Sequence, residues 1–565
     1  MNNKRFGTLL KNERMKQKIT AEQLGEGLYS VSMMKKIESG ERFPGKWMRD
    51  RLLQRLGISD YNDENFLFQV EYDRWELRTH LLDALETGKL EDAKLLLEQY
   101  RVKYGSENKL EHQFYLMMQV QYRQQRGFSK EQWFALLKEA VKLTVPQIDK
   151  KPCNQLLLSI DEVNLVLEYQ YYRQEELEHQ DITWYVPLFR YAENKWKDQD
   201  GMVKICSKIA LYFCRKIKQY VQTITEQKNR SLLIEDALAL CNESVQYLIK
   251  SRSIYFLLEL LQEKLQLLEL QMEMQRNSPN KQMQLQKEQE QSLEIVEVLQ
   301  RVYAAYDVLQ ETNANTYFYR EFEIYCINDV IKARRKMFKK KKTELTKICS
   351  ERTVRRIENK TGKVQLKIVI GLFQAFGLPV ELQRPSIITE CKEAISLERV
   401  YQCACVQGDF AEAKRCFVRL KKLISMENVQ NQQYIWCEEA YLLWRTKDIC
   451  TEQYVCLVKK ALEKTIPLQV AVSPIQDMYV AYKELEILNA LATCENMQDR
   501  AIYRDVLKAY CEQIENQNMV SNKRSAYRLT MGNQISWLSE QGQFERSRSL
   551  CRKLIKEQLR MRVLL

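Results

Sequence analysis

Two fifteen-residue stretches of the sequence carry cationic side chains at helical spacing. The first, SVSMMKKIESGERFP, runs from Ser30 to Pro44, and the second, SERTVRRIENKTGKV, runs from Ser350 to Val364. Apolar residues three or four positions apart mark the buried face of a helix, so the Lys and Arg residues between them project outward. Cationic donors gathered on one exposed face are suited to ion pairs and hydrogen bonds with an anionic partner.

Side chains for other chemistry are scarce or scattered. None of the three His residues stands beside a plausible nucleophile or in a ligand pair, and the 16 Cys residues lack CxxC spacing, even at Cys403 and Cys405. No Walker-type or GxGxxG loop is present. Adjacent carboxylates such as Glu91 and Asp92 are typical of solvated helix faces. We therefore expect reduced thiols, no metal, no cofactor and no enzymatic activity.

The composition predicts a helical protein with several units. The chain has 565 residues, whereas a domain takes about 150. Only 16 Gly and 9 Pro interrupt a sequence rich in Leu, Glu, Lys, Gln and Arg, which favours an all-α fold. No apolar run approaches the roughly 18 residues that span a bilayer, and no secretory apolar core follows the MNNKRFG start. We expect a cytoplasmic protein that does not enter a membrane.

The chain resembles itself at a nearly constant offset. Matching segments stand 320 or 321 positions apart, and their apolar positions coincide: FGTLLKNER from Phe6 with INDVIKARR from Ile327, LLQRLGI from Leu52 with LFQAFGL from Leu372, and GKLEDAK from Gly88 with GDFAEAK from Gly408. Chance similarity between helices would not keep one offset over such a length. The sequence therefore predicts a tandem duplication of a small module followed by a helical array.

The small module has the pattern of a helix-turn-helix unit. Apolar residues from Phe6 onward mark a first helix, Thr20 can cap a second, and Ser30 can cap a third. Met34 and Ile37 face inward on this third helix, which leaves its basic residues exposed. We expect five short helices within about 55 residues.

The stretch LGEGLYSVSMMKKIESG, from Leu24 to Gly40, resembles the Cro and phage-repressor type (XRE family) of helix-turn-helix. The signature of this family is a Ser-led recognition helix that ends in Ile-Glu-x-Gly. Its helix-1 Arg and its Glu after the recognition helix fall on Arg14 and Glu38, which the resemblance implies to be an ion pair. In the second copy they fall on Arg335 and Glu358.

The resemblance also implies which residues would contact DNA. The outward face of the third helix would read bases, and the helix-2 cap with the loop after helix 3 would hold phosphates. The base-reading residues are Val31, Ser32, Lys35 and Lys36, and the phosphate-contacting residues are Thr20, Arg42 and Lys46. The alternative is that all seven are ordinary solvated side chains.

The second copy departs from the family pattern. It loses one residue in the turn between helices 2 and 3, and it places Lys360 where Gly40 stands in the first copy. A left-handed backbone at that position would cost Lys about 1 kcal/mol. The candidate DNA contacts of this copy are Arg352, Arg355, Arg356 and Lys363. The alternative is a degenerate module kept for packing.

Positive charge is concentrated in the two modules. Residues 1–57 hold 13 Lys and Arg against 6 Asp and Glu, a net charge of +7, and residues 327–378 hold 15 against 4, a net charge of +11. The whole chain carries +13, so the rest must be net −5. Contact with phosphates requires this kind of concentration, and a generally basic surface would have spread the charge.

The segments outside the modules resemble tetratricopeptide-type (TPR) repeats. Three of them share a Gly, an apolar residue two positions on and a small residue three further, and they are ETGKLEDAKLLLEQY (Glu86 to Tyr100), VQGDFAEAKRCFVRL (Val406 to Leu420) and EQGQFERSRSLCRKL (Glu540 to Leu554). IEDALALC, from Ile234, is a weaker fourth. In helical hairpins the Gly ends one helix and the small residue lets its partner approach. Stacked hairpins form a superhelix whose inner face suits a peptide or protein, although such an array can also lack a ligand.

The order of units predicts four domains: a helix-turn-helix over 1–62, TPR-like repeats over 63–322, a second helix-turn-helix-like unit over 323–382 and TPR-like repeats over 383–565. This architecture resembles the RNPP group of peptide-responsive quorum-sensing regulators. The resemblance implies a sequence-specific regulator of transcription that binds double-stranded DNA and senses a signalling peptide or protein. Family members dimerise, so a homodimer is one expectation, and two modules in one chain could replace it. The alternative function is a repeat scaffold whose modules no longer touch DNA.

Overall fold

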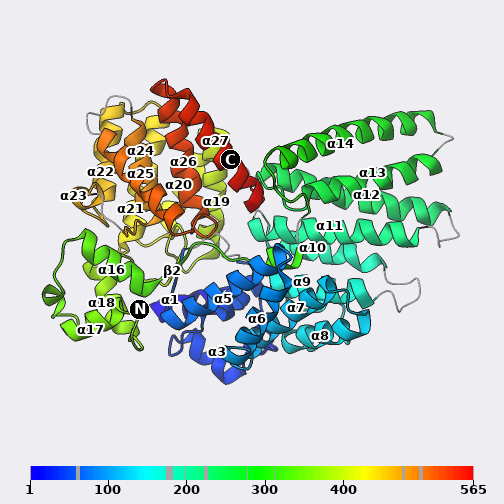
Figure 1. Cartoon of the computed structure of the whole chain (residues 1–565), viewed down its shortest axis with the longest axis horizontal. Coiled ribbons are helices and arrows are strands. Elements are labelled where there is room, and N and C mark those ends of the chain that lie inside the picture. The colour runs from blue at the N-terminus through cyan, green and yellow to red at the C-terminus, as the bar shows by residue number, and fades with distance from the viewer. Residues whose placement is uncertain are drawn as a thin grey trace.

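The structure, a computed structural model, confirms the all-α prediction. It describes residues 2–58, 64–173, 182–197, 199–221, 227–275, 278–311, 314–473, 477–494 and 500–563. These residues fold almost entirely into helices, with one small sheet near the middle of the molecule (Figure 1). No helix among them combines the length and the apolar character needed to cross a bilayer.

Each predicted module forms a compact head. The first head contains α1 (Asn2–Lys16), α2 (Ala21–Gly25), α3 (Val31–Glu38) and α4 (Lys46–Arg55), so residues 2–58 hold four helices rather than the five expected. The second head contains α16 (Ile327–Met337), the 3-10 helix η4 (Lys342–Leu345), α17 (Glu351–Glu358) and α18 (Leu366–Ala375).

Helical hairpins follow each head. The first array, from blue through cyan to green in Figure 1, contains α5 (Gln69–Glu86), α6 (Leu90–Lys103), α7 (Lys109–Gln125), α8 (Lys130–Thr144), η1 (Cys153–Gln155), α9 (Ile160–Arg173), η3 (Ile182–Trp184), α10 (Tyr185–Lys195), α11 (Asp200–Tyr220), α12 (Gln227–Lys250), α13 (Leu257–Met274), α14 (Pro279–Ala305) and α15 (Ala314–Phe318). The second array, from yellow to red, contains α19 (Lys392–Gln407), α20 (Phe410–Leu423), α21 (Val429–Arg445), α22 (Thr451–Leu462), α23 (Leu468–Ala471), α24 (Tyr482–Thr493), α25 (Arg500–Asn516), α26 (Arg524–Glu540) and α27 (Phe544–Met561).

The internal duplication extends to local geometry. Asn108 caps α7 by accepting hydrogen bonds from two backbone amides, and Asn428 caps α21 in the same way, 320 positions later. Left-handed backbone recurs at the same offset, at Gly57 with φ of 77° and at Gly377 with φ of 68°. Equal geometry at equal offset supports a duplicated unit and not merely a repeated composition.

The shared Gly and small residues of the predicted hairpins have the expected geometry. The Gly residues lie between paired helices with positive φ values: 68° at Gly88, 76° at Gly408 and 72° at Gly542. The small residues that follow, Ala93, Ala413 and Ser547, are buried where the second helix meets the first. The weaker IEDALALC segment differs, since it lies inside the single helix α12.

A three-stranded sheet joins the two heads. Its strands are β1 (Glu64–Leu67), β2 (Ile324–Cys326) and β3 (Gln383–Arg384), in the order β2-β1-β3. β1 pairs in parallel with β2, which leads into the second head, and antiparallel with β3, which follows it. The predicted boundaries after residues 322 and 382 therefore lie beside β2 and β3, and the boundary after residue 62 lies outside the described residues.

The second array returns to the first at its C-terminal end. The Ile254 amide donates to the Arg562 carbonyl at 2.9 Å, and the Arg562 guanidinium donates to the carbonyls of Leu309 at 2.7 Å and Glu311 at 3.0 Å. Leu559 of α27 also belongs to the hydrophobic core of the first array. The halves thus touch both at the sheet and at the C-terminal end (Figure 1).

Candidate nucleic-acid interface

Helix α3 presents one apolar and one polar face. Ser30 caps it by accepting a hydrogen bond from the Met33 amide, and Met34 and Ile37 are fully buried in the core of the first head. All four predicted base-reading residues are exposed on the opposite face, namely Val31, Ser32, Lys35 and Lys36. The helical period of the apolar residues was sufficient to predict this division.

The position of α3 is set by close contacts with α1. The Arg14 guanidinium donates to both carboxylate oxygens of Glu38, at 2.6 and 2.9 Å, and to the Ile19 carbonyl at 2.9 Å. The ion pair implied by the resemblance is therefore present. At Gly7 a Cβ atom would lie 2.4 Å from the Ile37 carbonyl oxygen, so only Gly allows α1 to pass so near the end of α3.

The predicted phosphate contacts Thr20 and Arg42 flank this face. Thr20 caps α2 by accepting from the Gln23 amide at 3.1 Å, and the backbone amide of Arg42 donates to the Lys36 carbonyl at 3.1 Å. Both side chains are exposed. Lys35, Lys36 and Arg42 take part in no ion pair with any residue that the structure describes, so their charges stay available to an anionic partner.

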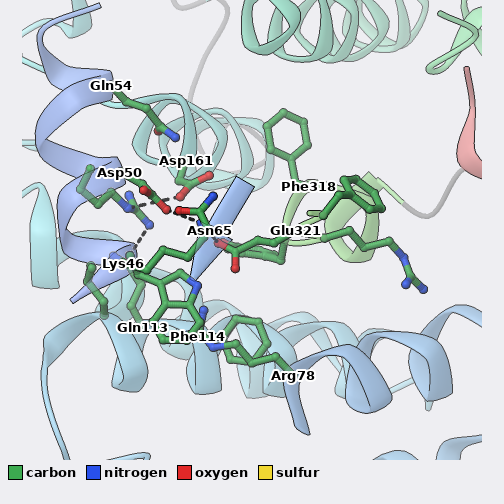
Figure 2. A pocket seen from close by; sticks show the side chains of 16 residues that line it. Lys46, Asp50, Gln54, Asn65, Arg78, Gln113, Phe114, Asp161, Phe318 and Glu321 are labelled. Atoms are coloured by element: carbon green, nitrogen blue, oxygen red, sulfur yellow. Dashed lines mark hydrogen bonds and ion pairs between the residues drawn. The ribbon is translucent and has the colours of Figure 1, made fainter. Parts of the chain in front are cut away.

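Lys46 is a correction to the predicted phosphate contacts. Its side chain is only 3% exposed, and its ammonium lies 2.6 Å from Asp50 Oδ2 and 3.1 Å from Glu321 Oε1 (Figure 2). Lys46 is the first residue of α4, which packs against the first array instead of facing solvent. Its partner Glu321 is 275 positions away, which is why the local sequence pattern was misleading.

Arg55 connects the turn between α2 and α3 with the first array. Its guanidinium forms a bidentate pair with the buried Glu162 of α9, at 2.9 and 2.6 Å. It also donates to the carbonyls of Leu24 in the last turn of α2 at 2.9 Å, of Glu26 directly after α2 at 2.7 Å, and of Thr144 at the end of α8 at 3.1 Å. Burial alone would raise the pKa of Glu162, but the adjacent guanidiniums outweigh it and lower that pKa.

A small polar cavity of about 60 Å³ lies at the junction where α4 of the first head meets the first array. Figure 2 shows side chains from α4, α7 and α9 pointing into it together with residues of the segment before β2. Among them, Arg51 donates to Gln113 Oε1 at 3.0 Å and lies 3.3 Å from Asp161. The cavity has room for water but not for a metabolite, so this junction is structural.

The junction changes how the charge of the first head is interpreted. Its α4 contributes Lys46, Arg49, Arg51 and Arg55 to the net charge of +7, and all four are buried. The exposed positive charge of the head is therefore carried by α1, by Lys18 in the loop after it, by α3 and by Arg42 in the loop after α3. The residues that sequence reasoning missed, Arg55 and Glu162, are 107 positions apart and leave no signal in a local window.

Comparison with known proteins found no matching family, no matching curated protein and no matching solved structure. The assignment of a function therefore rests on the geometry of the chain itself.

The second head has an ion pair equivalent to that of Arg14 with Glu38, but its own carboxylates neutralise more of its positive charge. Arg335 donates to both oxygens of Glu358, as Arg14 does to Glu38. Lys342, in the KKKK run, also reaches Glu358 at 3.0 Å, and Lys340 lies 3.4 Å from Glu344. Part of the predicted basic surface thus holds the second head together.

The predicted contact residues of the second head all lie on its surface. Arg352, Arg355, Arg356 and Lys363 are exposed. Arg355 is paired with Glu351 at 2.7 Å one turn away, and the guanidinium of Arg356 lies against Gly362. The second face is exposed like the first, and of its three arginines only Arg355 forms an ion pair with a residue that the structure describes.

Proposed function

We propose that the protein is a DNA-binding transcriptional regulator whose helical arrays respond to a peptide or protein partner. The observation that carries the proposal is the exposed face of α3, whose Lys35 and Lys36 have no ion-pair partner in the described chain and whose position is fixed by Arg14 and Glu38. Such a face offers phosphates and base edges a rigid set of donors.

Two heads in one chain support recognition of two adjacent half-sites. The β1 amides of Asn65 and Phe66 donate to carbonyls on the two sides of the second head, at Glu323 and Leu382, both at 2.8 Å. Phe43 of the first head also packs against the core of the second. Helices α3 and α17 lie toward the same lower edge in Figure 1. The chain itself would then supply the pairing that other regulators obtain by dimerisation.

The junction at Arg55 supplies a route from the arrays to the DNA. A partner that moved α8 or α9 would move Thr144 or Glu162, and with them the hydrogen bonds to the turn before α3. Such a partner changes DNA affinity only if it binds the two arrangements of the array with different affinity. The partner would be a peptide or protein in the groove of the repeats, as such arrays commonly bind.

The decisive test is the salt dependence of duplex binding, measured by fluorescence anisotropy on random and genomic duplexes. Lys35→Gln with Lys36→Gln should flatten the log–log slope by about 0.9 for each lost phosphate contact. Arg352→Gln with Arg356→Gln tests the second head in the same way. Lys94→Gln with Lys103→Gln on α6 removes equal charge from an exposed array surface and should leave the slope unchanged.

The outcomes separate the proposal from its alternative. A slope change from the first pair only would make the second head a structural element, which its internal ion pairs at Lys340 and Lys342 favour. No binding to any duplex at low salt would support a repeat scaffold whose heads do not touch DNA. If DNA binds but no peptide or lysate fraction alters its affinity, the sensing part of the proposal is wrong.

A further inference from the structure

A chamber of about 380 Å³ lies where the first head meets the segment that leaves the second. Its walls come from α1, the loop after α3, the residues 381–389 that follow the second head, the start of α11, and α19. A volume of about 300 to 1,000 Å³ is typical of sites that bind small molecules. This chamber is distinct from the polar cavity at the junction of α4 with the first array.

Most of the chamber wall is apolar. Phe6 and Phe43 meet edge to face, with 5.7 Å between their ring centroids. Leu9, Ile387 and Ile395 extend the same surface. An occupant therefore needs an apolar body.

Two buried carboxylates interrupt this wall. Glu381 is 8% exposed; its Oε1 accepts from Arg5 at 3.1 Å, but its Oε2 is buried and finds no donor among the described residues. Glu398 is also 8% exposed and accepts from the Tyr434 hydroxyl at 3.3 Å. Burial raises the pKa of Glu398, although Lys483 and Arg399 act in the opposite direction.

We propose that this chamber binds a small organic cation, in which an apolar body carries an ammonium group that pairs with Glu381 or Glu398. Both carboxylates line the chamber, and charge-assisted hydrogen bonds from an ammonium to a carboxylate are the strong ones in a buried site. The charged groups of the wall are the carboxylates of Asp200, Glu381 and Glu398 and the guanidiniums of Arg5 and Arg399, so the net charge of the wall is negative and disfavours an anion. An uncharged apolar molecule forms no charge-assisted bond there.

Occupancy would bear on both heads. Phe6 and Phe43 belong to the first head, whereas Glu381 follows the second, so a bound cation would contact the parts that set their relative position. This effect on DNA binding rests on the proposed function. The binding of the cation does not, because it is measured without DNA.

The experiment titrates the full-length protein with four eight-carbon probes by isothermal calorimetry. Octylamine and octyltrimethylammonium carry the positive charge, octanol is the neutral control, and octanoate reverses the charge. We expect both cations to bind about tenfold or more tightly than octanol, and octanoate not to bind. Equal affinity for octylamine and octanol would overturn the proposal, as would preferred binding of octanoate.

Substitutions locate the site. Glu381→Gln and Glu398→Gln should each be tested, and at least one should weaken octylamine binding about tenfold. The matched control is Glu427→Gln, an exposed carboxylate outside the chamber. Circular dichroism shows whether the variants fold, and if they do not, the probe series on the unaltered chain still decides the charge preference. Unchanged affinity for octylamine in both folded variants would show that the cation does not bind in this chamber.

Cys403 gives an independent readout because it lines the chamber and is an exposed residue. Saturating octylamine should slow alkylation of Cys403 by N-ethylmaleimide, measured by peptide mass spectrometry. The exposed Cys450 and Cys456 are controls in the same sample and should react at unchanged rates. Equal rates at all three thiols would contradict the location.

The positive charge could also come from the N-terminus of an apolar peptide. A Leu-Phe-Leu amide with an unmodified terminus is therefore compared with its N-acetylated form. Binding of the unmodified peptide in preference to octylamine would assign the site to peptide termini, and binding of octylamine alone would assign it to small amines. Loss of affinity on acetylation is expected whenever the ammonium is the recognised group.

Discussion

Gly40 and Lys360 occupy one backbone conformation with two very different side chains. Their φ values are 77° and 59°, so the turn after the recognition-type helix is left-handed in both heads. Lys360 adds an ion pair with Asp329 at 2.9 Å. An exposed pair contributes little, so the strain expected from the sequence is not offset by it.

The strain predicts the effect of two substitutions at Lys360. Both Lys360→Gly and Lys360→Ala lose the pair with Asp329, but only Gly relaxes the left-handed backbone. We expect Lys360→Gly to be more stable than Lys360→Ala by about 1 kcal/mol, measured by urea denaturation. Gly40→Ala should destabilise the first head by a similar amount. Equal stability of the two Lys360 variants would show that the second head relaxes in another way.

The buried carboxyl group of Glu64 makes the free energy of unfolding depend on pH. Burial raises its pKa to about 7, despite Arg384 and the Tyr479 hydroxyl, while Glu323 and Glu484 raise it further. A raised carboxyl pKa means that the folded chain holds the proton more tightly than the unfolded chain. The contribution of Glu64 to the free energy of unfolding is therefore fully present below pH 4.5. As the pH rises from 4.5 to 7, the free energy of unfolding falls by about 3 kcal/mol through this group.

The matching prediction compares Glu64→Gln with the unaltered chain. The amide does not titrate, so the variant should gain stability relative to the unaltered chain as the pH rises from 5 to 8. Urea midpoints at the two pH values measure this difference, and the shared titration of other groups cancels. Glu427→Gln, at an exposed position, should show no such change. Parallel pH profiles for Glu64→Gln and the unaltered chain would contradict a raised pKa.

At the scale of elements, the predictability of a helix depended on where its contacts lie in the sequence. Helix α3 was predicted correctly, with its Ser30 cap and its buried Met34 and Ile37, because all of these lie within eight residues. Helix α4 was misinterpreted at Lys46, since its polar residues meet α9 and the segment before β2. Duplication was visible in the sequence because a constant offset needs no knowledge of contacts. The sheet was not predicted, because strands of two to four residues are too short to show an alternating apolar pattern.

The pair of Arg55 and Glu162 predicts strong coupling between α4 and α9. Arg55→Met should destabilise the protein by about 3–5 kcal/mol, because it leaves a carboxylate buried without its partner. Adding Glu162→Leu should recover part of that loss, since the unpaired charge is then gone. Recovery is incomplete because the Leu24, Glu26 and Thr144 carbonyls still lack a donor. Urea denaturation of the two single variants and the double variant measures the coupling.

The exposed pair of Arg415 and Glu412 on α20 is the control for this cycle. Arg415→Met with Glu412→Leu should show no measurable coupling, since solvent screens both groups. A coupling at Arg55 as small as that at Arg415 would mean that the head is held to the array by its apolar contacts alone.

At the scale of the whole molecule, the two halves meet beside the first head, where the chamber lies and Lys392 donates to the Leu56 carbonyl, and at two further places. The sheet ties the heads together, and the C-terminal end of the second array rests on the first array. Two attachments restrict the relative motion of the halves far more than either alone, because a single attachment leaves a hinge. The separation of α3 from α17 is thus a property of the closed chain, and this is what would allow one molecule to match a fixed spacing of half-sites.

Arg562 is the residue to remove in order to open the second attachment. Its guanidinium donates to the carbonyls of Leu309 and Glu311 and lies 5.0 Å from the centre of the Tyr303 ring. Arg562→Ala should speed hydrogen exchange in peptides that cover residues 253–256, because the Ile254 amide is bound to the carbonyl of residue 562. Peptides from α1 to α3 should exchange at unchanged rates.

Arg560→Ala is the matched control, since Arg560 is exposed and pairs with Glu557 within the same helix. It should leave exchange at residues 253–256 unaltered. If Arg562→Ala also leaves hydrogen exchange at residues 253–256 unaltered, the apolar contact of Leu559 is sufficient to hold this end of the second array on the first. The hydrogen bonds of Arg562 then add no measurable stability to that contact. If exchange rises and small-angle scattering shows an expanded chain, the spacing of the heads depends on a contact at the far end of the arrays, and a ligand acting there could control it.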